Sequence, residues 1–273
     1  MRGFASAAYG AIIHPRMANI KLTIEYDGSN FAGWQSQADQ PTIQDEIERA
    51  LNELLGAKTT LHGAGRTDAG VHALAQIANF NCESTIPPDK FAQALQGLLP
   101  PEILIKKSEE VSKDFNSRFD ASSRMYRYRI GFQRSALMRL RRWEILGDNQ
   151  LSLDKLNEAA ALFSGKMDCS ALCVPRSLQE NNVCEITRSV WREVDGEYQY
   201  EIRANRFLHN MVRAIVGLSV RYGRSAMEGS PQENSKNDRL TLDRLRNILK
   251  SGTWTTDHLI APPQGLYLVE VSY

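Results

Sequence analysis

Three observations predict an α+β fold for this chain of 273 residues. Short segments in which apolar and polar residues alternate predict half-buried strands, and segments with apolar residues at helical spacing lie between them. The elements follow the order β-α-β-β-α-β, and this order occurs twice. Such an order is typical of the ferredoxin-like, or RNP-like, unit. We therefore expect two such halves, related by a pseudo-twofold axis and joined into a mixed, mainly antiparallel sheet with a central cleft.

The first half contains four expected strands and two expected helices. Its first helix has the clearest boundaries, because Thr42 and Asp45 form a capping box before it and Gly56 ends it. Prolines open and close the second helix. In chain order, the expected elements are a strand at 20–26, a helix at 43–55, strands at 59–62 and 72–81, a helix at 88–98 and a strand at 103–111.

The second half repeats the order with longer connections. Asp195 and Gly196 separate two alternating segments, and this dipeptide is a strong signal for a β-hairpin. We expect an irregular segment at 166–184 and a mobile polar loop at 229–237. The expected elements are strands at 124–132, 186–194, 198–204 and 266–271, and helices at 153–163, 207–223 and 242–249.

The arginines are unevenly distributed, although Lys and Arg total 33 against 32 Asp and Glu. Residues 115–145 hold eight arginines against two acids, and residues 203–224 hold five arginines and no acid. Arginine suits bidentate phosphate contacts and stacks on bases. These clusters are either ordinary solvated faces or, if they share one side of the fold, a surface for phosphates. We expect the arginine-rich strand at 124–132 to line the cleft.

The chain divides into an extension (1–17), an N-terminal α+β domain (18–117) and a C-terminal α+β domain (118–273). We expect the extension to be disordered; it has two arginines and no acid, which suits either a weak transit peptide or an upstream start codon. No apolar run approaches the roughly 18 residues of a membrane span. With four cysteines and no secretory leader, we expect a reduced, cytoplasmic protein, with organellar targeting left open.

The strongest candidate for a site is the segment from Gly63 to His72, which reads Gly-Ala-Gly-Arg-Thr-Asp-Ala-Gly-Val-His. Three glycines indicate a backbone that bends sharply or admits a ligand closely. The segment is neither a dinucleotide fingerprint nor a P-loop. Taken alone, it suits a tight turn with a surface ion pair as well as it suits an active site. Its carboxylate, Asp68, could act as a nucleophile or base without a metal or cofactor.

Six motifs follow one another along the chain: Glu25-Tyr26-Asp27-Gly28-Ser29, Gly33-Trp34-Gln35, and the segments 64–72, 119–128, 205–213 and 261–268. In this order they resemble the tRNA pseudouridine synthase A family. The resemblance extends from about residue 18 to the C-terminus. The Gly-Arg-Thr-Asp-Ala-Gly-Val core is specific when the other motifs accompany it.

The resemblance implies that the protein isomerises uridine to pseudouridine at positions 38–40 of the tRNA anticodon stem-loop, as a homodimer without a metal or nucleotide cofactor. Asp68 would be the catalytic nucleophile. Arg66 would enter the space left by the flipped base, and Tyr126 would line the pocket against that base. Arg213 is expected to bind substrate, although it could instead pair with Asp68 or with a backbone carbonyl.

The family's tRNA contacts correspond to Phe115, Asn116, Ser117, Arg118 and Phe119, to roughly 180–184, and to Arg134. The chain departs from the family pattern after Gly165, where Lys-Met-Asp-Cys-Ser replaces His-Asp-Phe, and at 84–87, where no basic residue occurs. We expect the arginines of the loop at 134–142, chiefly Arg139, Arg141 and Arg142, to compensate in tRNA binding.

Two alternatives stand beside this interpretation. The first is a non-catalytic tRNA-binding or chaperone protein on the same fold, in which Asp68 is structural. The second is a metal-dependent phosphodiesterase that uses Asp68 and nearby histidines. The sequence offers few clustered carboxylates for metal catalysis, and Cys169, Cys173 and Cys184 fit no zinc pattern.

Overall fold

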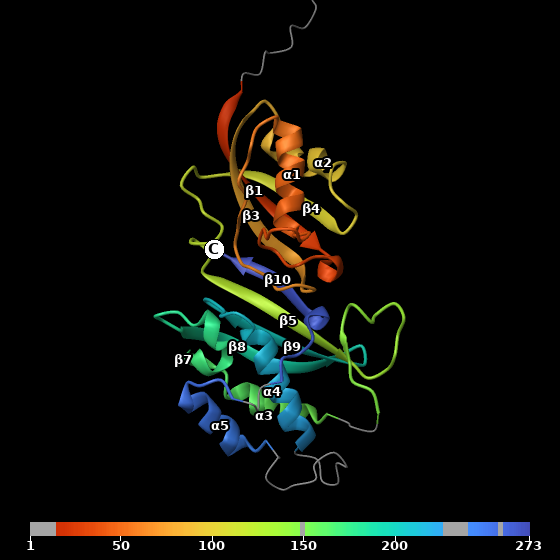
Figure 1. The fold of residues 1–273 in the computed structure, drawn as a ribbon, viewed down its shortest axis with the longest axis vertical. Coiled ribbons are helices and arrows are strands. Elements are labelled where there is room, and N and C mark those ends of the chain that lie inside the picture. The colour runs from red at the N-terminus through yellow and green to blue at the C-terminus, as the bar shows by residue number, and fades with distance from the viewer. Residues whose placement is uncertain (1–14, 148–150, 226–239, 256–258) are drawn as a thin grey trace, which may run out of the picture.

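The computed structural model describes residues 15–147, 151–225, 240–255 and 259–273. The molecule is elongated, and one sheet runs through both halves, with the first half above and the second below in Figure 1. Of the expected extension, residues 1–14 lie outside the described residues, as does the loop expected at 229–237.

The first half contains β1 (Arg16–Tyr26), α1 (Ile43–Leu55), β2 (His62–Gly63), β3 (His72–Ser84), α2 (Phe91–Gln96) and β4 (Ile103–Val111). The cap of α1 is confirmed, since Thr42 Oγ1 accepts a hydrogen bond from the Asp45 N–H at 3.2 Å. β1 begins two residues earlier than the expected domain boundary.

The strand expected at 59–62 is wrong in extent, because β2 has only His62 and Gly63. The preceding residues bond to side chains of α1 instead of to a strand. The Thr59 N–H donates to Asn52 Oδ1 at 2.6 Å, and the Leu61 N–H donates to Glu48 Oε1 at 2.9 Å. These bonds hold the segment against the helix until it reaches β3.

The second half contains β5 (Ser123–Gly131), β6 (Trp143–Glu144), α3 (Leu153–Ala161), β7 (Gly165–Asp168), β8 (Val183–Val194), β9 (Glu197–Ala204), α4 (Met211–Ser225), α5 (Leu242–Ser251) and β10 (Leu266–Ser272). The hairpin turn between β8 and β9 is confirmed, and Asp195 and Gly196 both have positive φ, as a type I′ turn requires. β7 lies in the segment that we expected to be irregular, where it pairs with β8 at the sheet edge.

The main path of the sheet follows the order β4-β1-β3-β10-β5-β9-β8-β7, while β2 pairs with β3 and β6 pairs with β5. The first half thus has the order β4-β1-β3-β2, and the second half has the matching order β10-β5-β9-β8. Both ferredoxin-like halves and the mixed, mainly antiparallel sheet are confirmed.

The two halves join where β10 runs parallel to β3, with Tyr267 opposite His72 and Leu268 opposite Ala73. Within each half the paired strands are antiparallel. The strand order and the strand directions therefore repeat without inversion. The halves follow one another head to tail, and the expected pseudo-twofold relation is wrong.

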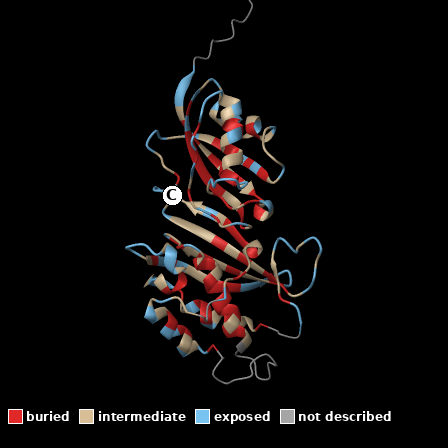
Figure 2. Cartoon of the chain, viewed as in Figure 1, coloured by how far each residue is buried: buried red, intermediate tan, exposed pale blue. Residues whose placement is uncertain are grey.

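A continuous apolar core extends through both halves, on the face of the sheet that the helices cover (Figure 2). On β1, Ile20, Leu22 and Ile24 are fully buried, and on β5 Tyr128 and Ile130 are fully buried. Among the described residues, no helix combines the length and apolar character that crossing a membrane requires.

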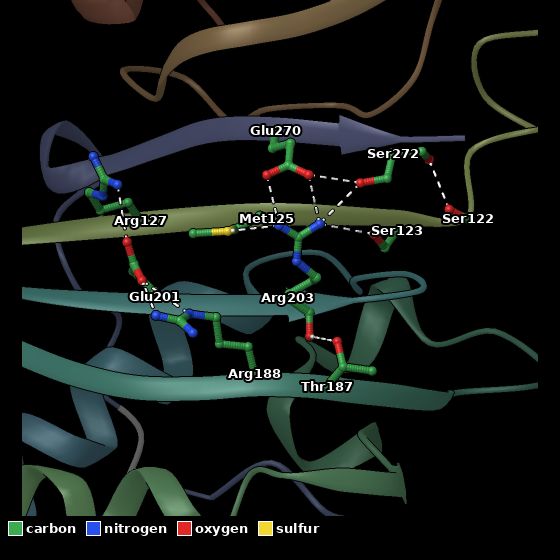
Figure 3. A network of polar contacts seen from close by, with 10 residues as sticks. All are labelled: Ser122, Ser123, Met125, Arg127, Thr187, Arg188, Glu201, Arg203, Glu270 and Ser272. Atoms are coloured by element: carbon green, nitrogen blue, oxygen red, sulfur yellow. Dashed lines mark hydrogen bonds and ion pairs between the residues drawn. The ribbon is translucent and has the colours of Figure 1, made fainter.

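The opposite face of the second half carries ion pairs instead of apolar side chains (Figure 3). Glu201 of β9 lies 3.0 Å from Arg127 and 2.6 Å from Arg188, and Arg203 lies 2.7 Å from Glu270. Arg129 pairs with Glu197 in the same way, at 2.8 Å. The expectation that the arginine-rich strand lines the cleft is therefore wrong for these two arginines of β5.

Candidate active site

The glycine-rich segment forms the loop between β2 and β3, and it packs backbone to backbone on the loop that follows β1. The Trp34 N–H donates to the Thr67 carbonyl at 3.0 Å, and the Gly70 N–H donates to the Phe31 carbonyl at 3.3 Å. Gly33 has φ +104°, and a Cβ there would lie 2.5 Å from the Thr67 oxygen. The glycines thus permit close contact between two loops.

Side chains from both halves hold the same loop. Tyr26 Oη and Thr67 Oγ1 share a buried hydrogen bond of 2.7 Å, and Gln76 Nε2 donates to the Gly65 carbonyl at 2.7 Å. Arg124 of β5 donates to the Ala64 carbonyl at 2.9 Å. The backbone around Arg66 and Asp68 is therefore fixed, while these two side chains line the cleft.

The Asp68 carboxylate is held by the second half of the molecule. Its Oδ2 lies 3.1 Å from Arg213 Nη1, and its Oδ1 lies 3.4 Å from His209 Nε2. Arg213 is anchored in turn, because its Nε donates to the Ala261 carbonyl at 2.7 Å and its Nη1 donates to Asn210 Oδ1 at 2.9 Å. This arrangement orients Asp68 and leaves it one-quarter exposed to the cleft.

Tyr126 of β5 forms the wall beside this carboxylate. It is 7% exposed, and its ring packs edge-to-face on Phe207 with the centroids 5.0 Å apart. Burial raises the pKa of the Tyr126 phenol, and the negative charge of Asp68 raises it further. The ring is therefore neutral near pH 7, and it offers a flat surface against which a planar ligand can pack.

The cleft has a volume of about 1600 Å³ and is lined by both halves, which confirms the expected central cleft. Among the described residues that line it, Asp68 is the single carboxylate, and the six cations with permanent charge are Arg66, Arg118, Arg124, Arg176, Arg206 and Arg213. Such a charge distribution suits a polyanion that brings its phosphates to the rim and a reacting group to Asp68.

The predicted RNA-contact segment after β4 separates into two groups. Asn116, Arg118 and Phe119 line the cleft, and the 77% exposed ring of Phe119 lies 5.4 Å from the Arg118 guanidinium. Ser117 is buried; its hydroxyl donates to the His62 carbonyl, and its N–H donates to Asn79 Oδ1 at 2.9 Å. Phe115 packs on the C-terminal tyrosine ring. The last two side chains brace the segment.

The predicted basic positions also differ in their surroundings. Arg66 is exposed, and within the described part of the chain its guanidinium has no hydrogen-bond or ion-pair partner. Arg134 is exposed on the loop after β5, away from the cleft lining. By contrast, Arg141 binds Asp27 at 2.7 Å, and Arg142 binds Glu197 at 2.7 Å. The structure therefore does not support our expectation that these last two arginines compensate in tRNA binding.

Sequence reasoning assigned no role to two neighbours of the loop. Arg124 was counted only within an arginine cluster, and His209 only within a motif. In the helix expected at 207–223, His209 and Arg213 would share a face by their spacing of four residues. However, α4 begins only at Met211, and His209 lies in the turn before it. Among the described residues, no group of three or more His, Cys, Asp or Glu side chains is placed to hold a metal ion.

Comparisons with known proteins agree with the motif pattern. The sequence profile of a family described as tRNA pseudouridine synthase matches residues 22–120 and 159–273. The tRNA pseudouridine synthase A of Acetivibrio thermocellus is 40% identical over 259 residues, which cover 94% of this chain and 100% of that protein. The proteins of the same name from Geotalea uraniireducens and Ruminiclostridium cellulolyticum are 39% and 37% identical, with the same coverage.

Proposed function

The chain belongs to the tRNA pseudouridine synthase family, and we propose that it isomerises uridine to pseudouridine at positions 38–40 of the tRNA anticodon stem-loop. The observation that carries this proposal is that, among the described residues lining the cleft, Asp68 is the single carboxylate and six arginines accompany it. A carboxylate can serve as a nucleophile or base in a reaction that needs no redox change.

Asp68 begins the reaction through Oδ1, because Arg213 occupies Oδ2. Attack on C1′, or removal of a proton to give a glycal, both start from this oxygen. The N1–C1′ bond breaks, the uracil turns within the pocket, and C5 bonds to C1′. The proton on C5 is then lost and N1 gains one, so that the product is an isomer of the substrate.

Tyr126 and Arg66 serve the flipped base. The neutral, buried phenol ring packs against the uracil and excludes water from one side of it. Extruding a base costs a few kcal/mol of unstacking. Within the described chain, the Arg66 guanidinium has no hydrogen-bond or ion-pair partner. Its planar group can therefore stack in the space that the flipped base leaves without breaking a contact.

The remaining cleft residues bind the RNA outside the reacting uridine. The arginines of the lining contact phosphates, and the exposed Phe119 ring with Arg118 stacks on an unpaired base. Arg134 contacts RNA beyond the cleft, whereas Phe115 and Ser117 act by bracing the segment that carries Phe119. We also infer that the protein works as a homodimer in the cytoplasm, as the family resemblance implies.

Asp68→Asn tests this function. The carboxamide keeps the size of the side chain but is a poor nucleophile and base. We expect the variant to bind tRNA normally and to lose tritium release from tRNA labelled at C5 of uridine. Asp89→Asn, which changes an exposed carboxylate of the same half, is the matched control with normal activity. A wild-type protein that binds tRNA and releases no tritium would support the non-catalytic alternative.

A further inference from the structure

The geometry assigns His209 to Asp68 as a positioning residue, with Ser177 holding the other side of the imidazole ring. This inference rests on the proposed function, and it deepens the account of the same site. The residue lies outside the glycine-rich loop, in the turn that begins α4. It is the described neighbour that approaches the oxygen of Asp68 not bound by Arg213.

Both ring nitrogens of His209 have polar neighbours. Nδ1 lies 2.9 Å from Ser177 Oγ, and Nε2 lies 3.4 Å from Asp68 Oδ1. The Asn210 amide nitrogen lies 3.5 Å from the same Nε2. When the serine hydroxyl donates to Nδ1, the ring proton of the neutral histidine lies on Nε2, toward the carboxylate. The Ser177 hydroxyl can donate or accept, so it is compatible with this tautomer, whereas the Asp68 carboxylate only accepts and favours the proton on Nε2.

The backbone conformations around His209 and Ser177 hold these two side chains next to each other. Asn210 has φ +61°, and the Met211 N–H donates to the Leu208 carbonyl at 3.1 Å, so the histidine lies in a tight turn. Ser177 ends a short 3-10 turn that begins at Pro175, and its hydroxyl faces the cleft beside Arg176. The rim segment that meets the RNA phosphates therefore also holds the ring.

The long contact between His209 and Asp68 suits positioning. At 3.4 Å, Nε2 limits rotation of the carboxylate about its Cβ–Cγ bond and leaves the lone pairs of Oδ1 free to react. The contact is not a hydrogen bond in the described structure, but catalytic hydrogen bonds are often long or poorly aligned in a free enzyme and tighten when substrate binds. Arg213 fixes one oxygen of the carboxylate, and His209 directs the other toward the sugar.

Two substitutions of His209 distinguish the contact at Nε2 from the contact at Nδ1. His209→Gln places an amide nitrogen near the position of Nε2, within reach of Asp68, whereas His209→Asn places one near Nδ1, where it meets only Ser177. We expect His209→Asn to lower the single-turnover rate about tenfold, the value of one hydrogen bond to a charged group, and His209→Gln to lower it clearly less. Ser177→Ala should lower the rate in the same direction by a smaller factor.

The measurements are tritium release at saturating enzyme, tRNA affinity, and thermal unfolding of each variant. Asp89→Asn serves again as the control, because Asp89 is exposed and lies outside the lining of the cleft. Normal rates in both His209 variants would overturn the inference, as would equal losses in both or a loss confined to tRNA affinity. Activity in Asp68→Asn would instead contradict the proposed function itself, so the two failures are distinguishable.

Discussion

The hairpin between the second and third strands is built differently in the two halves of the molecule. In the second half, β8 and β9 pair from Ile186 to Val194 and are joined by the two-residue turn at 195–196. In the first half, β2 has two residues, and the loop at 64–71 separates it from β3. The same topology therefore holds a regular hairpin in one half and the glycine-rich loop with Asp68 in the other.

This difference shows what the glycine-rich loop requires from its fold. Without a full second strand, backbone groups of the loop need other partners. Thr67 accepts from the Trp34 N–H, and the carbonyls of Ala64 and Gly65 accept from Arg124 and Gln76. These bonds hold the backbone of the loop in place, and they leave the Asp68 side chain facing the cleft.

The arginines of the two regions differ as well. At the cleft, Arg213 holds Asp68, and Arg124 donates to backbone carbonyls of the loop. The arginines on the back of the second half are instead paired with carboxylates, as Arg127 is with Glu201. A cleft arginine should therefore affect catalysis or RNA binding when it is substituted, and a back-face arginine should affect stability.

The largest effect is expected from Arg213, the link between the second half and the loop. Arg213→Gln removes the charge that faces Asp68 Oδ2 and weakens the bond to the Ala261 carbonyl. We expect the single-turnover rate to fall by about a hundredfold or more, since hydrogen bonds to charged groups contribute about 1.5–3 kcal/mol each. Arg213→Lys should recover part of this loss. A normal rate in Arg213→Gln would contradict the role of the second half in holding the carboxylate.

The next effect concerns Arg66 on the loop itself. Arg66→Ala should leave the unfolding temperature unchanged, because the side chain is exposed and has no partner in the described chain. If the side chain replaces the flipped base, the variant should lose about tenfold more activity on a hairpin with a base-paired target uridine than on one with an unpaired target. The check is the ratio of the two rates, and an equal loss on both hairpins would refute this role.

Two arginines from the segment after β5 contrast a structural ion pair with a predicted tRNA contact. Arg142 is 11% exposed and bound to Glu197, so Arg142→Gln should cost about 2 kcal/mol in the free energy of unfolding. Arg134→Gln should leave stability unchanged, weaken tRNA binding and lower the slope of binding against salt by about one. Denaturant titration and salt-dependent binding measure both. If Arg134→Gln leaves the salt slope unchanged, Arg134 does not contact tRNA.

The smallest effect is a pH dependence at His72, which joins the loop to β3. The buried ring accepts from the Gly28 N–H at 3.1 Å and lies 3.0 Å from the Leu140 carbonyl. Burial lowers the pKa of His72 from 6.5, although the Asp27 carboxylate acts in the opposite direction. The unfolded chain therefore binds the proton first as the pH falls.

The contribution of His72 to folding stability is fully present above pH 6.5, the pKa of an unfolded histidine. It is lost as the pH falls toward the lower pKa of His72 in the folded state. We expect stability to fall between pH 7 and pH 5, and the slope to be smaller in His72→Asn. The check is the free energy of unfolding across this range. A wild-type slope retained in His72→Asn would assign the dependence to another group.

Local signals account for the parts of the fold that sequence predicted well. The Thr42 cap and Gly56 define α1, the Asp195-Gly196 turn defines the second hairpin, and the alternation at 103–111 gives the bounds of β4. Each of these depends on residues that are close together in the chain. Asp68 differs, because its glycines alone left the role open and the prediction of a catalytic residue came from motifs spread along the whole chain.

The features that sequence missed depend on side-chain contacts that periodicity and local motifs do not reveal. β2 is short because Thr59 and Leu61 bond to side chains of α1, and periodicity does not reveal such bonds. Alternation placed Arg127 opposite the apolar face of β5, but not beside Glu201 on another strand. The contact of His209 with Ser177 spans 32 residues, and only the folded chain brings them together.

The central claim is that Asp68, presented by the first half and held by the second, makes pseudouridine in the anticodon stem-loop. Pseudouridine mapping of tRNA from cells that lack this gene, complemented with the wild type or with Asp68→Asn, tests it most directly. We predict that pseudouridine at positions 38–40 is lost without the gene, returns with the wild type, and stays absent with Asp68→Asn. Restoration by Asp68→Asn, or unchanged pseudouridine at these positions without the gene, would contradict the account.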